Sequence, residues 1–219
     1  MIFSSEIERK LDSVESAIAV LIKLLESQTS EAYKIADYKF WPCLSHDEIK
    51  SIEDQVGFSL PEEYVAFLER IGNGSVNPYQ GLYAVSHSLK ICKTRRLDIP
   101  FPHQSAWNTE YDGSSAVISA EDLEKPHFEP RLSSSEKIWM ADYFSDDHLS
   151  GCFPVARMDY EFQLIVSGEE RGHIWEDVRH VDEGLSPYLI HGEKVTFLTW
   201  YESELDAHLN LLRCTNDQH

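Results

Sequence analysis

The sequence predicts an α+β fold, and three observations support this class. Two capping-box patterns, in which a serine is followed three residues later by a glutamate, indicate helix starts at Ser5 and Ser45. Short segments rich in aromatic and β-branched residues follow one another over residues 137–179, as is typical of an antiparallel meander. An apolar stripe at helical spacing over residues 196–212 predicts a terminal helix that packs by one face on the sheet.

The first helix carries a heptad pattern of apolar residues. The members of this seam are Ile7, Leu11, Val14, Ile18, Leu21 and Leu25. The alternating spacing of three and four residues predicts one helix of about 20 residues. The seam either packs on the body of the protein or holds a homodimer together. We expect residues 1–40 to form this amphipathic helix and a connector, and residues 41–219 to form the main domain, with an excursion at about 87–136.

A short helix is predicted within the stretch GFSLPEEYVAFLERIGNGS, residues 57–75, because its apolar residues recur at helical spacing between a proline and a glycine. The positions with an expected structural role are Leu60, Pro61, Tyr64, Phe67, Leu68, Gly72, Asn73 and Gly74. The Gly-Asn-Gly end is interpreted as a turn from helix to sheet. The alternative is a glycine-lined ligand site, although a phosphate loop would need a strand before it and a helix after it.

Five segments are predicted to be strands of a curled antiparallel sheet. They are residues 81–86, 137–144, 151–158, 161–168 and 172–179. Trp175 falls in the last of these segments, and Trp200 falls in the terminal helix. We interpret both tryptophans as core residues; the alternative is that they are exposed anchors, because the centres of protein interfaces also use such side chains.

The chain is strongly acidic, and this limits its partners. It has 38 Asp and Glu against 19 Lys and Arg, a net charge of −19. Such a surface repels phosphate backbones and anionic lipids, so we expect neither nucleic-acid nor membrane binding, and it attracts basic proteins. The alternative is a solvated surface that resists aggregation. Most of the negative charge lies in the C-terminal half, with −7 over residues 106–150 and −8 over 151–219.

No pattern typical of a catalytic, cofactor or metal site is found. The chain has no CxxC pair, no HExxH and no GxSxG. We therefore expect no catalytic residue, no cofactor and no metal ligand. A hydrolase that works through a pair of carboxylates stays an alternative, because the distance required between the two carboxylates is a property of the fold and not of the sequence spacing.

A cytoplasmic location is expected. The four cysteines are widely spaced, and free thiols in a reducing compartment are the simplest interpretation. The first ten residues contain acids where a secretory signal would have bases, and no apolar run approaches the length of a membrane span.

The order of three groups of motifs resembles the SUKH superfamily, the Smi/Knr-type domain. The groups are IxxIE with GFSLPEEYVAFLERIGNGS and GLYAV, then EFQLIVSGEERGHIWEDVR, then TFLTWYESELDAHL. The resemblance implies an α+β fold with a curved antiparallel sheet of about six strands. It also implies a non-enzymatic role, because many bacterial members are immunity proteins that neutralise a polymorphic toxin, often a nuclease or deaminase. Eukaryotic relatives act as regulatory or scaffold proteins.

Acidic residues near the predicted strands are the candidates for partner contact. They are Asp159, Glu161, Glu169, Glu170, Glu176, Asp177, Asp182 and Glu183. If the partner is a nuclease toxin, its cleft is basic and these carboxylates can occupy the same field. The alternative is a solvated edge that discourages strand pairing. The functional hypotheses are thus stoichiometric toxin occlusion, a scaffold that docks or dimerises through the N-terminal helix, and a carboxylate hydrolase.

Overall fold

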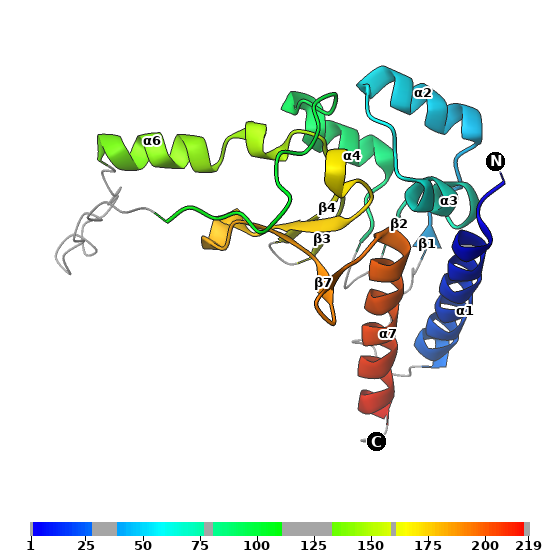
Figure 1. Ribbon diagram of the computed structural model, residues 1–219. Coiled ribbons are helices and arrows are strands. Elements are labelled where there is room, and N and C mark those ends of the chain that lie inside the picture. Colours follow the sequence, from blue (N-terminus) through cyan, green and yellow to red (C-terminus); the bar gives the residue numbers. More distant parts are fainter. Residues whose placement is uncertain (1, 28–38, 77–80, 111–132, 159–160, 217–219) are drawn as a thin grey trace, which may run out of the picture.

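The computed structural model describes residues 2–27, 39–76, 81–110, 133–158 and 161–216, and Figure 1 shows their arrangement. The α-helices in these ranges are α1 (Ser5–Ser27), α2 (His46–Val56), α3 (Glu62–Arg70), α4 (Val85–Ile91), α6 (Ser134–Tyr143) and α7 (Phe197–Asn216). The 3-10 helices are η2 (Cys92–Thr94), η3 (Asp146–Leu149), η4 (Gly168–Glu170) and η5 (Arg179–Val181). None of the described helices is both long enough and apolar enough to cross a membrane.

The central sheet has four antiparallel strands in chain order. They are β3 (Cys152–Met158), β4 (Glu161–Val166), β5 (Ile174–Asp177) and β6 (Leu185–Pro187). Two separate pairs are formed by β1 (Lys39–Phe40) with β2 (Ser75–Val76), and by β7 (Leu189–Ile190) with β8 (Glu193–Lys194). The fold is α+β, as predicted, but the sheet has four strands rather than about six.

One predicted strand, residues 81–86, supplies only a single bridge. Leu82 forms an antiparallel bridge to β3, and α4 begins soon after it. The bridge falls where the pairing of β3 with β4 shifts register after Pro154, whose ring nitrogen has no hydrogen to donate. The carbonyl of Val155 accepts a hydrogen bond from the N–H of Tyr83 at 2.7 Å instead.

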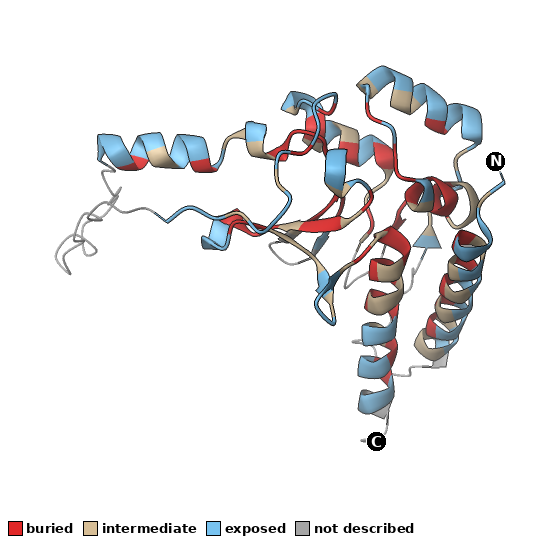
Figure 2. Ribbon diagram, viewed as in Figure 1, coloured by how far each residue is buried: buried red, intermediate tan, exposed pale blue. Residues whose placement is uncertain are grey.

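A second predicted strand, residues 137–144, is a helix, and that prediction is wrong. The Ser133 side chain accepts a hydrogen bond from the N–H of Glu136, whose carboxylate accepts one from the N–H of Ser133. This capping box starts α6, and the Lys, Met and Ala that follow favour a helix over the strand indicated by the aromatic residues. Helix α6 projects from the body and is largely exposed (Figures 1 and 2).

Both faces of the central sheet are buried. In β4, Ile165 joins the large apolar cluster that contains the buried residues of α1, α3 and α7, whereas Leu164 joins a smaller cluster on the other face. In β5, Ile174 and Trp175 divide between the two clusters in the same way. Trp175 is fully buried, and its ring centroid lies 4.7 Å from that of Phe101.

The heptad face of α1 packs within the chain, mainly against α7, and the two helices lie side by side in Figure 1. The buried residues of this contact are Ile7, Leu11, Val14, Ile18 and Leu21 from α1 and Leu205, Leu209 and Leu212 from α7. The surface that a homodimer would use is therefore covered. The start of α1 is fixed by the Ser4 hydroxyl, which accepts the N–H of Ile7 at 3.3 Å, rather than by Ser5.

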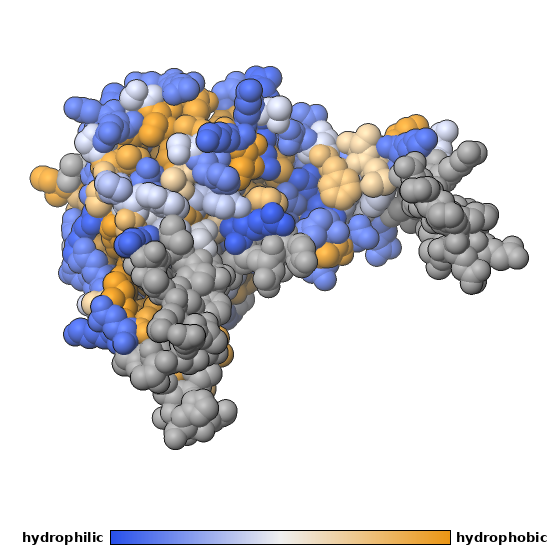
Figure 3. All heavy atoms as spheres, turned by 180° about the vertical axis from the view of Figure 1, so that it is seen from behind, coloured by the Kyte–Doolittle hydropathy of each residue, from blue (hydrophilic) through white to orange (hydrophobic). Residues whose placement is uncertain are grey.

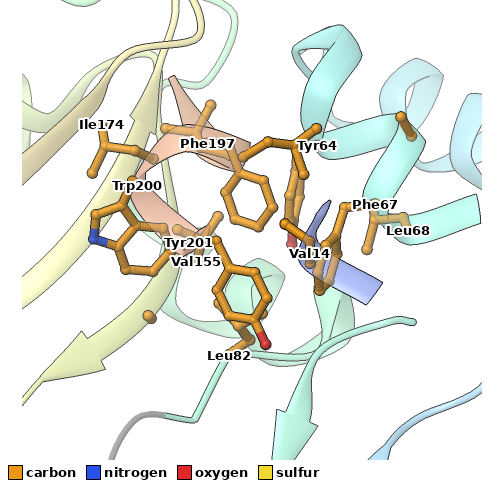
Figure 4. Packing of buried hydrophobic residues seen from close by; sticks show 14 of the residues in the cluster. Val14, Tyr64, Phe67, Leu68, Leu82, Val155, Ile174, Phe197, Trp200 and Tyr201 are labelled. Carbon is orange, nitrogen blue, oxygen red and sulfur yellow. The ribbon is translucent and has the colours of Figure 1, made fainter. Parts of the chain in front are cut away.

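The terminal helix is predicted to pack on the sheet, but it packs mostly on α1 and α3. Near the start of α7, Trp200 lies close to Ile174 of β5 (Figure 4). Phe197 and Tyr201 from α7 pack edge-on against Phe67 from α3, with both centroid distances at 5.2 Å. Aromatic pairs in this geometry contribute roughly 0.5–1.5 kcal/mol beyond their buried area, so these rings bind α7 firmly to α3.

The Gly-Asn-Gly sequence turns the chain from α3 into β2. At Gly72 a Cβ would lie 2.7 Å from the carbonyl oxygen of Trp41, and Gly74 has a φ of +84°, so both positions require glycine. The side chain of Asn73 accepts the N–H of Val85 at 2.9 Å and thereby caps the start of α4. The whole motif therefore joins a helix, a strand and the next helix.

Glu63 of α3 holds three helices together. One carboxylate oxygen accepts the N–H of Leu198 at 2.9 Å, in the first turn of α7. The other accepts a hydrogen bond from Nζ of Lys10 in α1 at 2.7 Å. Because the first N–H groups of a helix have no partner inside it, a carboxylate at this place both satisfies a donor and opposes the positive end of the helix dipole.

Replacing Glu63 with alanine should lower the free energy of unfolding by about 1–2 kcal/mol, the usual effect of losing a helix cap. Urea unfolding of the full chain measures this change. Glu62→Ala is the matched control, because Glu62 is the exposed neighbour in the same first turn. Equal losses in the two variants would show that the Glu63 contacts do not stabilise the helices.

Candidate partner-binding surface

The eight carboxylates predicted to contact a partner do not form one group. Asp177 of β5 pairs with Phe162, and Glu161 opens β4, so both lie at the same end of the sheet. Glu169 and Glu170 lie in η4, beyond the other end of β4. Asp159 lies outside the described residues.

Carboxylates at the η4 end are partly used inside the chain. The carboxylate of Glu170 forms an ion pair with Nζ of Lys194 at 2.6 Å, and Nδ1 of His173 lies 3.2 Å from the same carboxylate. Lys194 also donates to the carbonyl of Gln104 at 2.7 Å. Glu169 is exposed beside them. The lysine therefore compensates much of the negative charge at this end.

Glu176 is half-buried on the face of the sheet that turns toward α7. Its charge acts on Tyr188, whose hydroxyl donates to Glu204 at 2.9 Å. Burial, followed by the charge of Glu204 and then that of Glu176, raises the pKa of Tyr188 to about 12. Glu176 thus belongs to an interior polar group, although it is adjacent in sequence to Asp177.

Asp177 is buried in an ion pair and is not available to a partner. Nε and Nη2 of Arg179 each donate to one of its carboxylate oxygens, both at 2.8 Å. The aspartate is 8% exposed and the arginine 5%. This bidentate geometry matches the planar guanidinium to the carboxylate. The predicted contact role of Asp177 is therefore replaced by a positioning role.

Arg179 also connects the sheet to the end of α6. Its Nη1 donates to the carbonyls of Tyr143 at 2.9 Å and Ser145 at 3.2 Å, and its guanidinium lies 5.9 Å from the ring centroid of Phe144. A second connection runs through Asn108, which accepts the Tyr143 hydroxyl at 2.9 Å and donates to the carbonyl of Asp182 at 2.7 Å. Helix α6 therefore leaves the body at a fixed position beside η5.

A series of stacked rings connects the end of α6 to the smaller apolar cluster, against which Trp107 packs. Tyr143 stacks on Trp139 and on Trp107, and Trp107 stacks on His148 with centroids 3.9 Å apart. His148 in turn stacks on His103, with a ring nitrogen contact of 3.3 Å between them. Burial, then the charges of His148 and Arg179, lowers the pKa of His103 to about 4.

The contacts of Arg179 and Asn108 hold η5 beside the end of α6, and we name five exposed side chains of these two elements and of the residues directly after η5 the α6–η5 surface. Met140, Phe144 and Val181 are 36%, 43% and 52% exposed, although all three are apolar. Asp182 and Glu183 follow Val181 in the chain and are exposed as well. Apolar side chains in water beside acids are typical of a protein contact surface.

Sequence reasoning found the two acids of this surface but not its apolar part. The strand predicted over residues 137–144 places Met140 and Phe144 in the sheet, whereas in the structure they lie at the end of the projecting helix α6. The capping box at Ser133 and Glu136 was the available signal, because it is the same pattern that marks α2 at Ser45. The position of η5 beside the end of α6 has no local signal in the sequence, because it depends on the contacts of Arg179.

The described residues offer little to catalysis or metal binding. No group of three or more His, Cys, Asp or Glu in them is placed to hold a metal ion. Cys92 and Cys152 are buried, and burial raises the pKa of the Cys92 thiol to about 11 and that of Cys152 well above its usual value. Both thiols are therefore poor nucleophiles near neutral pH.

A pocket of about 400 Å³ opens beside β2 and α4. Trp41, Leu82 and Tyr83 form much of its lining, and the ring of Tyr83 lies 4.6 Å from that of His87. The described residues that line it include no carboxylate. It therefore gives no support to the hypothesis of a carboxylate hydrolase.

Breaking the Arg179 pair should destabilise the protein strongly. Arg179→Met leaves the Asp177 carboxylate buried without its partner, which typically costs about 3–5 kcal/mol. Urea unfolding measures the loss, and Arg179→Lys is the milder variant because it keeps the charge without the bidentate geometry. Combining Arg179→Met with Asp177→Leu should recover part of the loss. No recovery would contradict a cost that arises from the unpaired carboxylate.

The stability of the protein should fall in acid because of His103. Its folded pKa of about 4 lies below the ordinary histidine pKa of 6.5, so the unfolded chain binds the proton first as the pH falls. Stability is then full above pH 6.5 and is lost progressively down to about pH 4. Thermal unfolding of His103→Phe should show a smaller decrease over this range. The control is His191→Asn, on an exposed turn, which should follow the wild type.

Comparison with known proteins places the chain in a family. A model of the SMI1 / KNR4 family (SUKH-1) matches residues 43–188, which include α2, α3 and the whole central sheet. Comparison with curated proteins and with solved structures gave no match. Helices α1 and α7 lie outside the matched residues. The match covers well over half of the chain, and the protein therefore belongs to the SMI1 / KNR4 family (SUKH-1).

Proposed function

We propose that this protein is a cytoplasmic, non-enzymatic immunity protein that binds a cognate toxin and neutralises it by occlusion. The family supports a role in protein binding, because many of its bacterial members neutralise toxins. The observation that carries the proposal is the α6–η5 surface, where apolar side chains stand exposed on a rigid base beside carboxylates. A rigid contact surface suits stoichiometric inhibition, since little order must be gained on binding.

Electrostatics favour a basic toxin, such as a nuclease. A cleft that holds phosphate must be positive, and a chain with a net charge of −19 is attracted to it. This attraction raises the rate of association and weakens as salt is added, because the Debye length shortens to about 3 Å at 1 M.

A scaffold that dimerises through the N-terminal heptad is the less supported alternative. The apolar face of α1 is already buried against α7, and Arg70 of α3 holds α1 through ion pairs to Glu8 and Glu15 at 2.8 and 2.7 Å. A dimer through this seam would have to expose these groups first.

Co-expression tests the proposal. The C-terminal domain of the protein encoded by the adjacent gene is produced in bacteria with and without this chain. We expect the domain to stop growth, the chain to restore it, and the two to co-purify in a one-to-one complex that salt weakens. A toxic domain that this chain neither binds nor inhibits, or an adjacent gene that encodes no toxic domain, would contradict the proposal.

A further inference from the structure

We infer that the α6–η5 surface is where the partner docks, and that it takes a basic protein through one flank of α6. This inference rests on the proposed function and adds the site of contact. Its exposed apolar side chains are Met140 and Phe144 at the end of α6 and Val181 in η5, and its exposed acids are Asp182 and Glu183, which follow Val181. Apolar atoms are exposed along the projecting α6 in Figure 3, at the right of that view.

The geometry of α6 selects the flank. Residues in an α-helix turn by about 100° each, so Met140 and Phe144 project from nearly the same side. The N–H of Phe144 still donates to the carbonyl of Met140 at 3.0 Å, so the helical path continues to this residue. Ile138, which is 71% exposed, lies about 200° from Met140 around the helix and faces the opposite flank.

Rigid support makes this flank suitable for docking. The Phe144 ring lies against the buried guanidinium of Arg179, two residues before Val181. Arg179 holds both carbonyls at the end of α6, and Asn108 ties Tyr143 to Asp182. The end of α6 and η5 are therefore held together before any partner arrives. Because this surface is already ordered, binding a partner costs little conformational entropy, and more of the contact energy appears as affinity.

Charge determines the partner chemistry. Asp182 and Glu183 are exposed directly after η5, and Asp146 and Asp147 are exposed on η3, which follows α6. Arg179 is buried and paired with Asp177, and Arg95 lies 3.7 Å from Asp146. Lys137 is exposed on α6. The negative charge offered to a partner is therefore mainly that of Asp182 and Glu183. A surface that offers these acids and apolar residues matches a basic surface with its own apolar residues, and it opposes a second copy of this chain.

The test measures binding of the purified toxic domain from the adjacent gene to the full chain and its variants. Met140→Asp should weaken binding by about 30-fold, since a hot-spot residue contributes roughly 2 kcal/mol or more. Asp182→Asn with Glu183→Gln should lower the association rate and the salt dependence of binding. Asparagine is chosen because Asp182 has a φ of +62°, a conformation that asparagine tolerates.

Three matched controls locate the effect. Ile138→Asp places the same charge in the same helix on the other flank, and Leu211→Asp places it on α7, where the leucine is 54% exposed. Glu169→Gln removes an exposed acid at the opposite end of the sheet. All three should bind within about twofold of the wild type, and far-ultraviolet circular dichroism should show that every variant is folded.

The outcomes separate the inference from the proposed function. If the wild type binds and only Met140→Asp and the double variant Asp182→Asn with Glu183→Gln weaken binding, the result supports both the docking site and the immunity function. Wild-type binding that these variants leave unchanged, or that Ile138→Asp or Glu169→Gln weakens instead, overturns the docking site and leaves the immunity function standing. Failure of the wild-type chain to bind the toxic domain overturns the function and, with it, the inference.

Discussion

Burial of the central sheet on both faces is the constraint on which the other features depend. Leu164 and Ile165 point to different apolar clusters, so neither face of the sheet is open to a partner. Strands covered in this way form near-continuous apolar runs, which is why β4 is dominated by apolar residues. A binding surface must therefore lie at an end of the sheet or on an element that projects from it, and helix α6 is such an element.

Arg179 determines where that element leaves the body. Burying its guanidinium costs free energy unless the N–H donors have acceptors. The acceptors are the Asp177 carboxylate and the carbonyls of Tyr143 and Ser145. One buried charge thus joins β5, η5 and α6. The stacked rings from Trp139 to His103 extend the same support to the smaller apolar cluster. The contact surface is a consequence of this network rather than of the strands themselves.

The sequence predicts what is decided locally. The capping box at Ser45, the heptad of α1 and the strands β3 to β5 follow from spacing and composition, and the family follows from the order of motifs. Features decided by distant contacts are missed. Glu176 and Asp177 are neighbours in sequence, yet alternation along β5 sends them to different faces. The sequence over residues 137–144 predicts a strand because aromatic residues favour strands, although a capping box at Ser133 and Glu136 precedes them.

Hydrogen exchange on the complex with the toxic domain would show directly whether the α6–η5 surface is the docking site. It reports which backbone amides become protected when the partner binds. We expect new protection over residues 137–145 and 179–184, which include the end of α6 and η5. Protection confined to η4 and β8, at the opposite end of the sheet, would contradict this docking site.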